Sequence, residues 1–451
     1  MAQRFWGLRG SKLVLAIWIE ACFGVMTFGY NMGAAGAVLS NASFNDQFPR
    51  INTVTTTGTE RQKNSTIQGT VVAMYALFGM FGSVACIFLG DLLGRRKTIF
   101  IAGIVNGIGA VIQSTAFSLG QLIVGRIILG LGTGGIIATV SLWQSEVSKA
   151  ENRGSHVSAF GVFTGSGLSL SLWTGLGMSA KPFILELAQS LHLSITRKSS
   201  LAMQKGKWEE AREILNLLHN EDPDFEETTK QLEDIRISLE RAGNASIFTM
   251  FKMGPQRSLH RVILAAIPQM FLQMSGINVI AQYTPVVFEQ FLGFDAFDSG
   301  VLAAASQFAV ILGAICCSWT VDRVGRRKLM LISATMMSIC FACLSGLLAH
   351  PENRTGIKAA AFFIYFYLFV YVLGFLGIPF LYASEVAVTQ FRAPTTGLST
   401  AVSWLFNFIV AEVTPVGFAN IGWKYFLMYC CINALCVPTI YFFFPEQLDA
   451  H

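Results

Sequence analysis

Long apolar stretches recur along the whole chain and are separated by short polar segments. An α-helix needs roughly 20 mostly apolar residues to cross a bilayer, and eleven stretches reach or approach that length. They lie near 11–35, 66–90, 98–117, 120–144, 154–178, 260–289, 298–320, 329–349, 358–385, 394–417 and 421–444. This pattern predicts an all-α membrane protein that crosses the bilayer many times.

The composition agrees with this class and excludes others. Of 451 residues, 53% are hydrophobic and only 13% are charged, which argues against a cytosolic enzyme, a disordered chain or a nucleic-acid binder. The nine cysteines lie in apolar runs, as small hydrophobic residues do in membrane helices, and not in a disulfide or zinc-binding pattern. No nucleophile–base set, metal cluster or phosphate loop stands out. We therefore predict neither an enzyme nor a metal site nor a cofactor.

Basic residues predict the orientation in the membrane, because cytoplasmic loops carry an excess of Lys and Arg. Most of the 32 Lys and Arg residues lie in segments that one alternating topology places on the same side. These segments are 1–12, 91–97, 149–153, 197–261 and 323–328. We expect a multi-pass protein of the plasma membrane with both termini in the cytoplasm.

An internal repeat divides the chain into two halves. Gly-Asp-Leu-Leu-Gly-Arg-Arg-Lys at 90–97 returns as Val-Asp-Arg-Val-Gly-Arg-Arg-Lys at 321–328, and a Glu seven residues before an Arg also occurs in each half. Two signals repeated in the same order indicate two homologous helical bundles. The predicted parts are an N-terminal bundle at 1–200, a cytoplasmic linker with short amphipathic helices at 201–257 and a C-terminal bundle at 258–451.

The repeated charged residues have a physical role available to them. Guanidinium groups form forked pairs with carboxylates, and such pairs between the bundles would hold the cytoplasmic side shut. The alternative is ordinary positive-inside topology with headgroup contacts, but recurrence in both halves favours a latch. The predicted latch residues are Asp91, Arg95, Arg96, Glu146, Arg153, Asp322, Arg326, Arg327, Glu385 and Arg392.

An ordered set of motifs covers nearly the whole chain. It comprises Gly29-Tyr30-Asn31, the two Gly-Arg-Arg turns, Gly125-Arg126, Trp143-Gln144-Ser145-Glu146, Gln273-x-x-Gly276-x-Asn278, Pro379…Glu385 and Trp404 with Asn407. In this order the motifs resemble the sugar porter family of the major facilitator superfamily, most closely its fungal hexose-transporter-like members. The resemblance implies two pseudo-symmetric six-helix bundles. It also implies a monomeric carrier that moves a small neutral sugar across the lipid bilayer by alternating access.

A sugar site needs amides to bind hydroxyls and aromatic faces to cover the ring. Gln273, Asn278, Trp404 and Asn407 match positions that bind sugar in the family, and Tyr283 lies within the same polar stretch. Phe28 and Phe380 are candidate aromatic lids. For any single amide or Phe the simpler interpretation is helix–helix packing. The chain departs from the family in carrying Leu272-Gln273 where the family has two glutamines.

Proton symporters of the family usually carry an Asp at the position of Asn31, facing the arginine that corresponds to Arg126. An amide cannot titrate, so the resemblance favours facilitated diffusion over proton symport.

The sixth crossing is the anomaly. The charge pattern requires a span between about 179 and 200, but the apolar part runs only from 182 to 195 and contains Glu186. Those 14 residues make a helix of roughly 21 Å, against a hydrocarbon core of about 30 Å. We therefore expect a truncated sixth helix. An alternative function follows: a non-transporting sugar sensor, or an inactive, truncated product of a sugar transporter gene.

Overall fold

The computed structural model describes residues 11–39, 42–53, 55–147, 160–177, 247–253, 257–350, 352, 354–388 and 391–444. All regular elements in these ranges are helices, which confirms the all-α class. They are α1 (Ser11–Leu39), α2 (Ala42–Gln47), η2 (Pro49–Ile51), α3 (Gly58–Leu93), α4 (Arg95–Ser114), α5 (Leu119–Val147), α7 (Phe160–Gly177), η4 (Ile247–Phe251), α12 (Ser258–Met274), α13 (Ile277–Gln290), α14 (Ala296–Val324), α15 (Arg326–Leu348), α16 (Arg354–Tyr371), η5 (Val372–Leu376), α17 (Ile378–Val386), α18 (Arg392–Ile421) and α19 (Lys424–Phe443).

Ten candidate membrane spans occur within the described part of the chain, each a stretch long and apolar enough to cross a bilayer. They coincide with ten of the eleven predicted spans. The remaining one, 154–178, contains the 18-residue helix α7. The predicted linker and the expected truncated sixth helix fall almost entirely outside the described residues.

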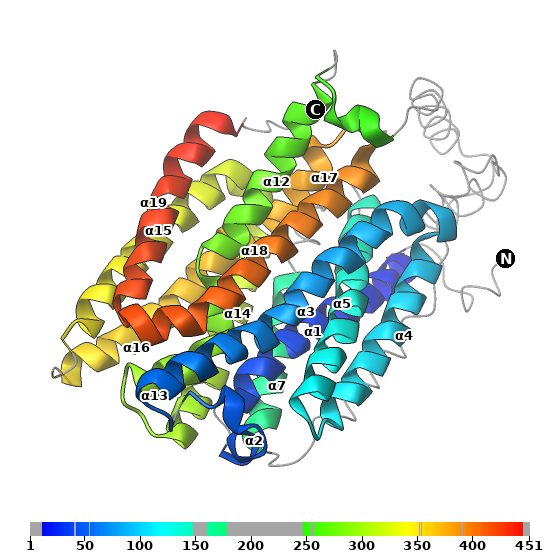
Figure 1. Ribbon diagram of the computed structural model, residues 1–451. Coiled ribbons are helices and arrows are strands. Elements are labelled where there is room, and N and C mark those ends of the chain that lie inside the picture. The colour runs from blue at the N-terminus through cyan, green and yellow to red at the C-terminus, as the bar shows by residue number, and fades with distance from the viewer. Residues whose placement is uncertain are drawn as a thin grey trace, which may run out of the picture.

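The helices form two bundles that lie side by side (Figure 1). Helices α1, α3, α4, α5 and α7 make up the first, and α12 to α19 the second. The bundles meet most extensively where α3 runs along α18 and where α7 runs along α14. A path through the middle of the protein must therefore be lined by both halves.

The repeated turn has the same backbone in both bundles. Gly94, between α3 and α4, has φ 83° and ψ 152°, and Gly325, between α14 and α15, has φ 92° and ψ 150°. Side chains other than glycine rarely adopt a positive φ, so a glycine is required at this reversal. The shared conformation supports the internal repeat read from the sequence.

Two helices of the second bundle are interrupted near the middle of the protein. Gly276 adopts a left-handed conformation (φ 97°, ψ 10°) and separates α12 from α13. A Cβ at this position would lie 2.8 Å from the Phe341 ring. The turn of π-helix η5 separates α16 from α17. Broken helices expose backbone and polar side chains within a span, which transporters use for substrate sites.

Candidate substrate-binding site

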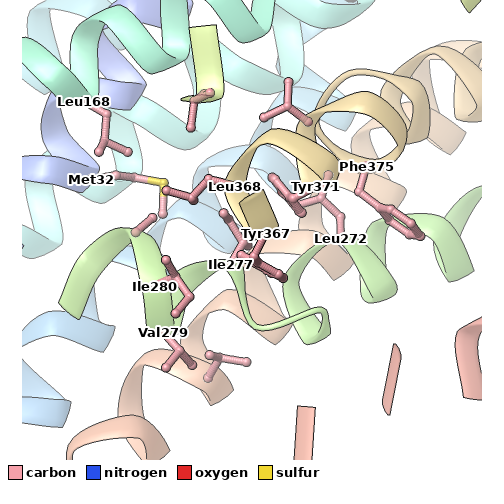
Figure 2. Packing of buried hydrophobic residues seen from close by; sticks show 14 of the residues in the cluster. Met32, Leu168, Leu272, Ile277, Val279, Ile280, Tyr367, Leu368, Tyr371 and Phe375 are labelled. Atoms are coloured by element: carbon pink, nitrogen blue, oxygen red, sulfur yellow. The ribbon is translucent and has the colours of Figure 1, made fainter. Parts of the chain in front are cut away.

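A cavity of about 70 Å³ lies between the two bundles, next to the breaks in α12–α13 and α16–α17. The first bundle contributes mainly apolar side chains, and Figure 2 shows Met32 beside Leu368 of the second bundle. The polar side chains that line the cavity are Thr164, Gln273, Asn278, Gln307, Thr400, Ser403 and Asn407. No charged side chain is among the lining residues that the structure describes.

Three of these side chains, one each from α12, α13 and α18, form a hydrogen-bonded relay. Asn278 donates from Nδ2 to Oε1 of Gln273 over 2.7 Å, and Gln273 donates from Nε2 to Oγ of Ser403 over 2.9 Å. The break at Gly276 makes this possible, because it lets the ends of α12 and α13 present both amides together. The relay holds the two predicted amides Gln273 and Asn278 in one orientation.

Other amide atoms at the cavity have no protein partner among the described residues. Both side-chain amide atoms of Asn407 are buried and unpaired, as is Oδ1 of Asn278. An unpaired buried amide atom typically costs about 1–3 kcal/mol. Residues that carry such atoms in the wall of a cavity are suited to bind hydroxyl groups of a ligand.

Aromatic rings complete the walls. Trp404 lies edge-on to Phe28, with ring centroids 5.6 Å apart, and edge-on to Tyr75 at 5.5 Å. Phe28, Phe380 and Trp404 all line the cavity, so the structure brings these three predicted residues together with the amides. Such rings can cover the C–H faces of a sugar.

Tyr283 lies apart from this group. Its hydroxyl donates to the Ala411 carbonyl over 3.1 Å, and its ring packs edge-on against Phe418. It lines a different, smaller cavity together with Arg61 and Gln290. The predicted aromatic therefore belongs to the contact between the bundles and not to the lining of the central cavity.

The two predicted coupling residues have separate hydrogen-bond partners. Asn31 donates from Nδ2 to Asn106 Oδ1 over 3.1 Å and to Thr133 Oγ1 over 3.2 Å. Arg126 donates to the Val72 carbonyl over 3.3 Å, and its guanidinium lies over the Tyr75 ring. The described contacts of Asn31 are thus with neutral groups.

The structure describes the predicted latch residues in the C-terminal half of the chain. Arg326 lies 3.3 Å from both Asp322 and Glu385, and these ion pairs tie the turn after α14 to α17 within one bundle. Arg327 donates to the Tyr441 carbonyl over 2.6 Å, and Arg392 is the first residue of α18.

The side chains of the first-half latch residues lie outside the described part of the structure. Asp91 lies in α3, Arg95 and Arg96 begin α4, and Glu146 lies near the end of α5, whereas Arg153 is outside the described residues. A pair between the two bundles therefore stays a prediction.

A separate set of polar contacts joins the bundles at the end of the molecule opposite the Gly94 and Gly325 turns. We call it the distal seam. Arg61 donates to Gln290 over 2.7 Å, Gln62 to Asn420 over 3.2 Å and Thr70 to Glu412 over 2.8 Å. Close packing of α3 on α18 accompanies these bonds.

Sequence reasoning missed Gln307, Ser403, Thr164 and Thr400 as lining residues. Gln307 carried a usable signal, since an amide in the middle of an apolar span is expensive unless it is paired or functional. Ser and Thr give no comparable signal, because they commonly bond to the carbonyl of their own helix, as Thr164 does with Phe160.

Two helical bundles that enclose a cavity walled by apolar side chains, aromatic rings and a few amides define the class: a membrane carrier with the major facilitator fold. The pattern of the sugar (and other) transporter family matches residues 17–449, so the chain belongs to that family. The sugar transporter STL1 of Saccharomyces cerevisiae is 31% identical over 464 residues, covering 98% of this chain and 80% of that protein.

More distant relatives and a solved structure are also similar to this chain along most of its length. Quinate permease of Neurospora terricola is 27% identical, covering 94% of this chain and 85% of its own length. High-affinity glucose transporter 1 of Candida albicans is 26% identical, covering 93% of this chain and 81% of its own length. The proton:xylose symporter XylE bound to 6-bromo-6-deoxy-D-glucose shares the fold, with a TM-score of 0.81 at 21% identity over 96% of both chains.

Proposed function

We propose that this protein carries a small neutral sugar or polyol across a membrane by alternating access. The observation that supports it most is the central cavity, where unpaired amide atoms and aromatic rings from both bundles converge next to two broken helices. A ligand bound there contacts both halves, so rocking of one bundle against the other exposes it to either side.

The lining favours a neutral substrate over an anionic one. The names of relatives include both glucose and quinate, which is a carboxylate at neutral pH. Carboxylate binding in a low-dielectric cavity calls for a cation, and the described lining consists of amides, hydroxyls and apolar groups. A hydroxyl-rich neutral molecule fits these groups.

We further propose facilitated diffusion. The coupling position holds Asn31, whose described partners Asn106 and Thr133 cannot titrate in the physiological range. In this proposal the carrier is a monomer in the plasma membrane, with the basic turns after Gly94 and Gly325 in the cytoplasm. The Arg326 ion pairs then serve the cytoplasmic gate.

The direct test is uptake of radiolabelled D-glucose, D-xylose and D-sorbitol by the purified chain in liposomes. Saturable uptake of at least one is expected, and Asn407→Leu should lower it at matched protein content because it removes two unpaired amide atoms. Ser338→Ala is a suitable control, since its hydroxyl bonds to the Cys430 carbonyl away from the cavity. No saturable uptake of any of the three would overturn the proposal.

A second candidate, an inactive product of a transporter gene, is favoured by the 14-residue apolar run at 182–195. A matched pair tests it: the chain as it stands, and a version with a full apolar sixth span. Uptake by the extended version alone would establish the inactive product, and equal uptake by both would exclude it.

A further inference from the structure

Gln307 is a polar residue of the cavity wall whose role the proposed function leaves open. It lies on α14, is fully buried and lines the cavity together with Val310, one turn further along the same helix. The surrounding span is otherwise strongly apolar. An amide at such a place is costly without a hydrogen-bonding partner.

The hydrogen bonds of α14 fix which end of this amide points away from the helix. Ser306 donates its only hydroxyl hydrogen to the Ala303 carbonyl over 2.7 Å, so Ser306 Oγ can only accept. Gln307 Nε2 donates to that oxygen over 3.1 Å. A flipped amide would either set two acceptors against each other or take the Ser306 hydrogen away from the Ala303 carbonyl, so only the observed orientation keeps both hydrogen bonds.

The remaining atom, Gln307 Oε1, is therefore held as an acceptor. It is buried and has no hydrogen-bond partner among the described residues. We propose that Gln307 Oε1 accepts a hydrogen bond from a substrate hydroxyl, and that the α14 wall thereby selects hydroxyl donors. This inference rests on the proposed function, because it names a residue that would set the specificity of that same site.

A buried amide in this protein does not by itself indicate a substrate-binding residue, and Gln269 provides the comparison with Gln307. It is also fully buried, and both of its amide atoms are unpaired among the described residues, yet it is not part of the cavity lining. Gln307 differs in being part of the cavity wall, and its unpaired amide atom is an acceptor whose orientation the Ser306 bond holds. Gln269 is therefore the matched control.

Deoxy and deoxyfluoro analogues of D-glucose separate the two possible roles of a protein group. Fluorine can accept weakly but cannot donate. If Gln307 accepts a hydrogen bond from one hydroxyl of the sugar, the deoxy analogue and the deoxyfluoro analogue at that ring position both lack the donor. Both should therefore bind more weakly than D-glucose, and to the same extent. The expected loss is about 3- to 10-fold in competition against labelled D-glucose, the size of one neutral hydrogen bond.

Two variants assign this penalty to Gln307. In Gln307→Leu the deoxy and deoxyfluoro analogues at the ring position that donates to Gln307 should bind as well as D-glucose does to that variant. In Gln269→Leu both analogues should still bind more weakly than D-glucose. In Ser306→Ala the amide loses the partner that orients it and can turn its N–H group toward the substrate. The fluoro analogue should then bind better than the deoxy analogue.

The outcomes are distinguishable. Absence of saturable uptake by the unmodified chain would overturn the proposed function itself. Saturable uptake with the same analogue profile in Gln307→Leu as in the unmodified chain would overturn only the role of Gln307. If Gln307→Leu is not recovered as folded protein, the analogue profile of the unmodified chain decides: a fluoro analogue that binds as well as D-glucose at every ring position refutes the acceptor role.

Discussion

The distal seam offers a sharp test of how the two bundles close. Thr70 of α3 donates to Oε1 of Glu412 on α18 over 2.8 Å, which joins the bundles directly. The backbones are also in close contact here, since a Cβ on Gly69 would lie 2.5 Å from the Glu412 carbonyl oxygen. This bond can exist only while the distal end is closed. Its loss should therefore shift the conformational equilibrium toward the state that is open at this end.

The change is Thr70→Val, which keeps the size of the side chain and removes the donor. A hydrogen bond to a charged group contributes about 1.5–3 kcal/mol. The Thr70 hydroxyl also lies 3.1 Å from the Thr66 carbonyl, so this carbonyl and the Glu412 carboxylate share one hydrogen. The low end of that free-energy range therefore applies. About 1.4 kcal/mol corresponds to a tenfold change in an equilibrium constant, so the open population should rise roughly tenfold.

The assay is the rate at which a membrane-impermeant thiol reagent modifies a cysteine introduced as Ser65→Cys. Ser65 is 1% exposed and lines the small cavity at the seam with Arg61 and Gln290. The introduced cysteine should be labelled about ten times faster when Thr70→Val is also present. The labelling rate of the parent protein, which lacks the introduced cysteine, is subtracted from both rates. Thr66→Val is the matched control, because among the described residues its hydroxyl bonds only to the Gln62 carbonyl of its own helix. Equal rates in both variants would refute the reasoning.

Four further outcomes are expected. Gly79→Leu should weaken D-glucose binding in a competition assay, because even a Cβ there would lie 2.7 Å from the Trp404 ring; unchanged binding would contradict this packing. Arg326→Ala should increase thiol accessibility from the cytoplasmic side, since it removes charge-assisted bonds of about 1.5–3 kcal/mol; unaltered accessibility would argue against a gate there. Sugar uptake should not alkalinise the external medium, because Asn31 cannot carry a proton; sugar-dependent alkalinisation of a poorly buffered suspension would exclude uniport. Asn64 should carry no glycan in mass-spectrometric mapping, because its side chain is 6% exposed and its amide donates to two carbonyls; an occupied site would show that this segment is open.

Much of the architecture follows from the sequence because its causes are local. Runs of about 20 apolar residues must form helices in a bilayer, since hydrocarbon offers no partner to an exposed backbone. The repeated turn predicted two related bundles, and Gly94 and Gly325 indeed share one unusual backbone conformation. The motif around Gly276 likewise pointed to Gln273 and Asn278, which the helix break brings to the cavity.

The tertiary structure decided which polar groups meet. Gln273 bonds to Ser403, 130 residues away, and no periodicity within either span identifies that partner. For the same reason Tyr283 lies at the seam, and Asn31 bonds to Asn106 and Thr133. A helical pattern specifies which residues share a face. Which face meets which neighbour depends on how whole helices pack, and that packing also placed Gln307, with its unpaired acceptor, in the cavity wall.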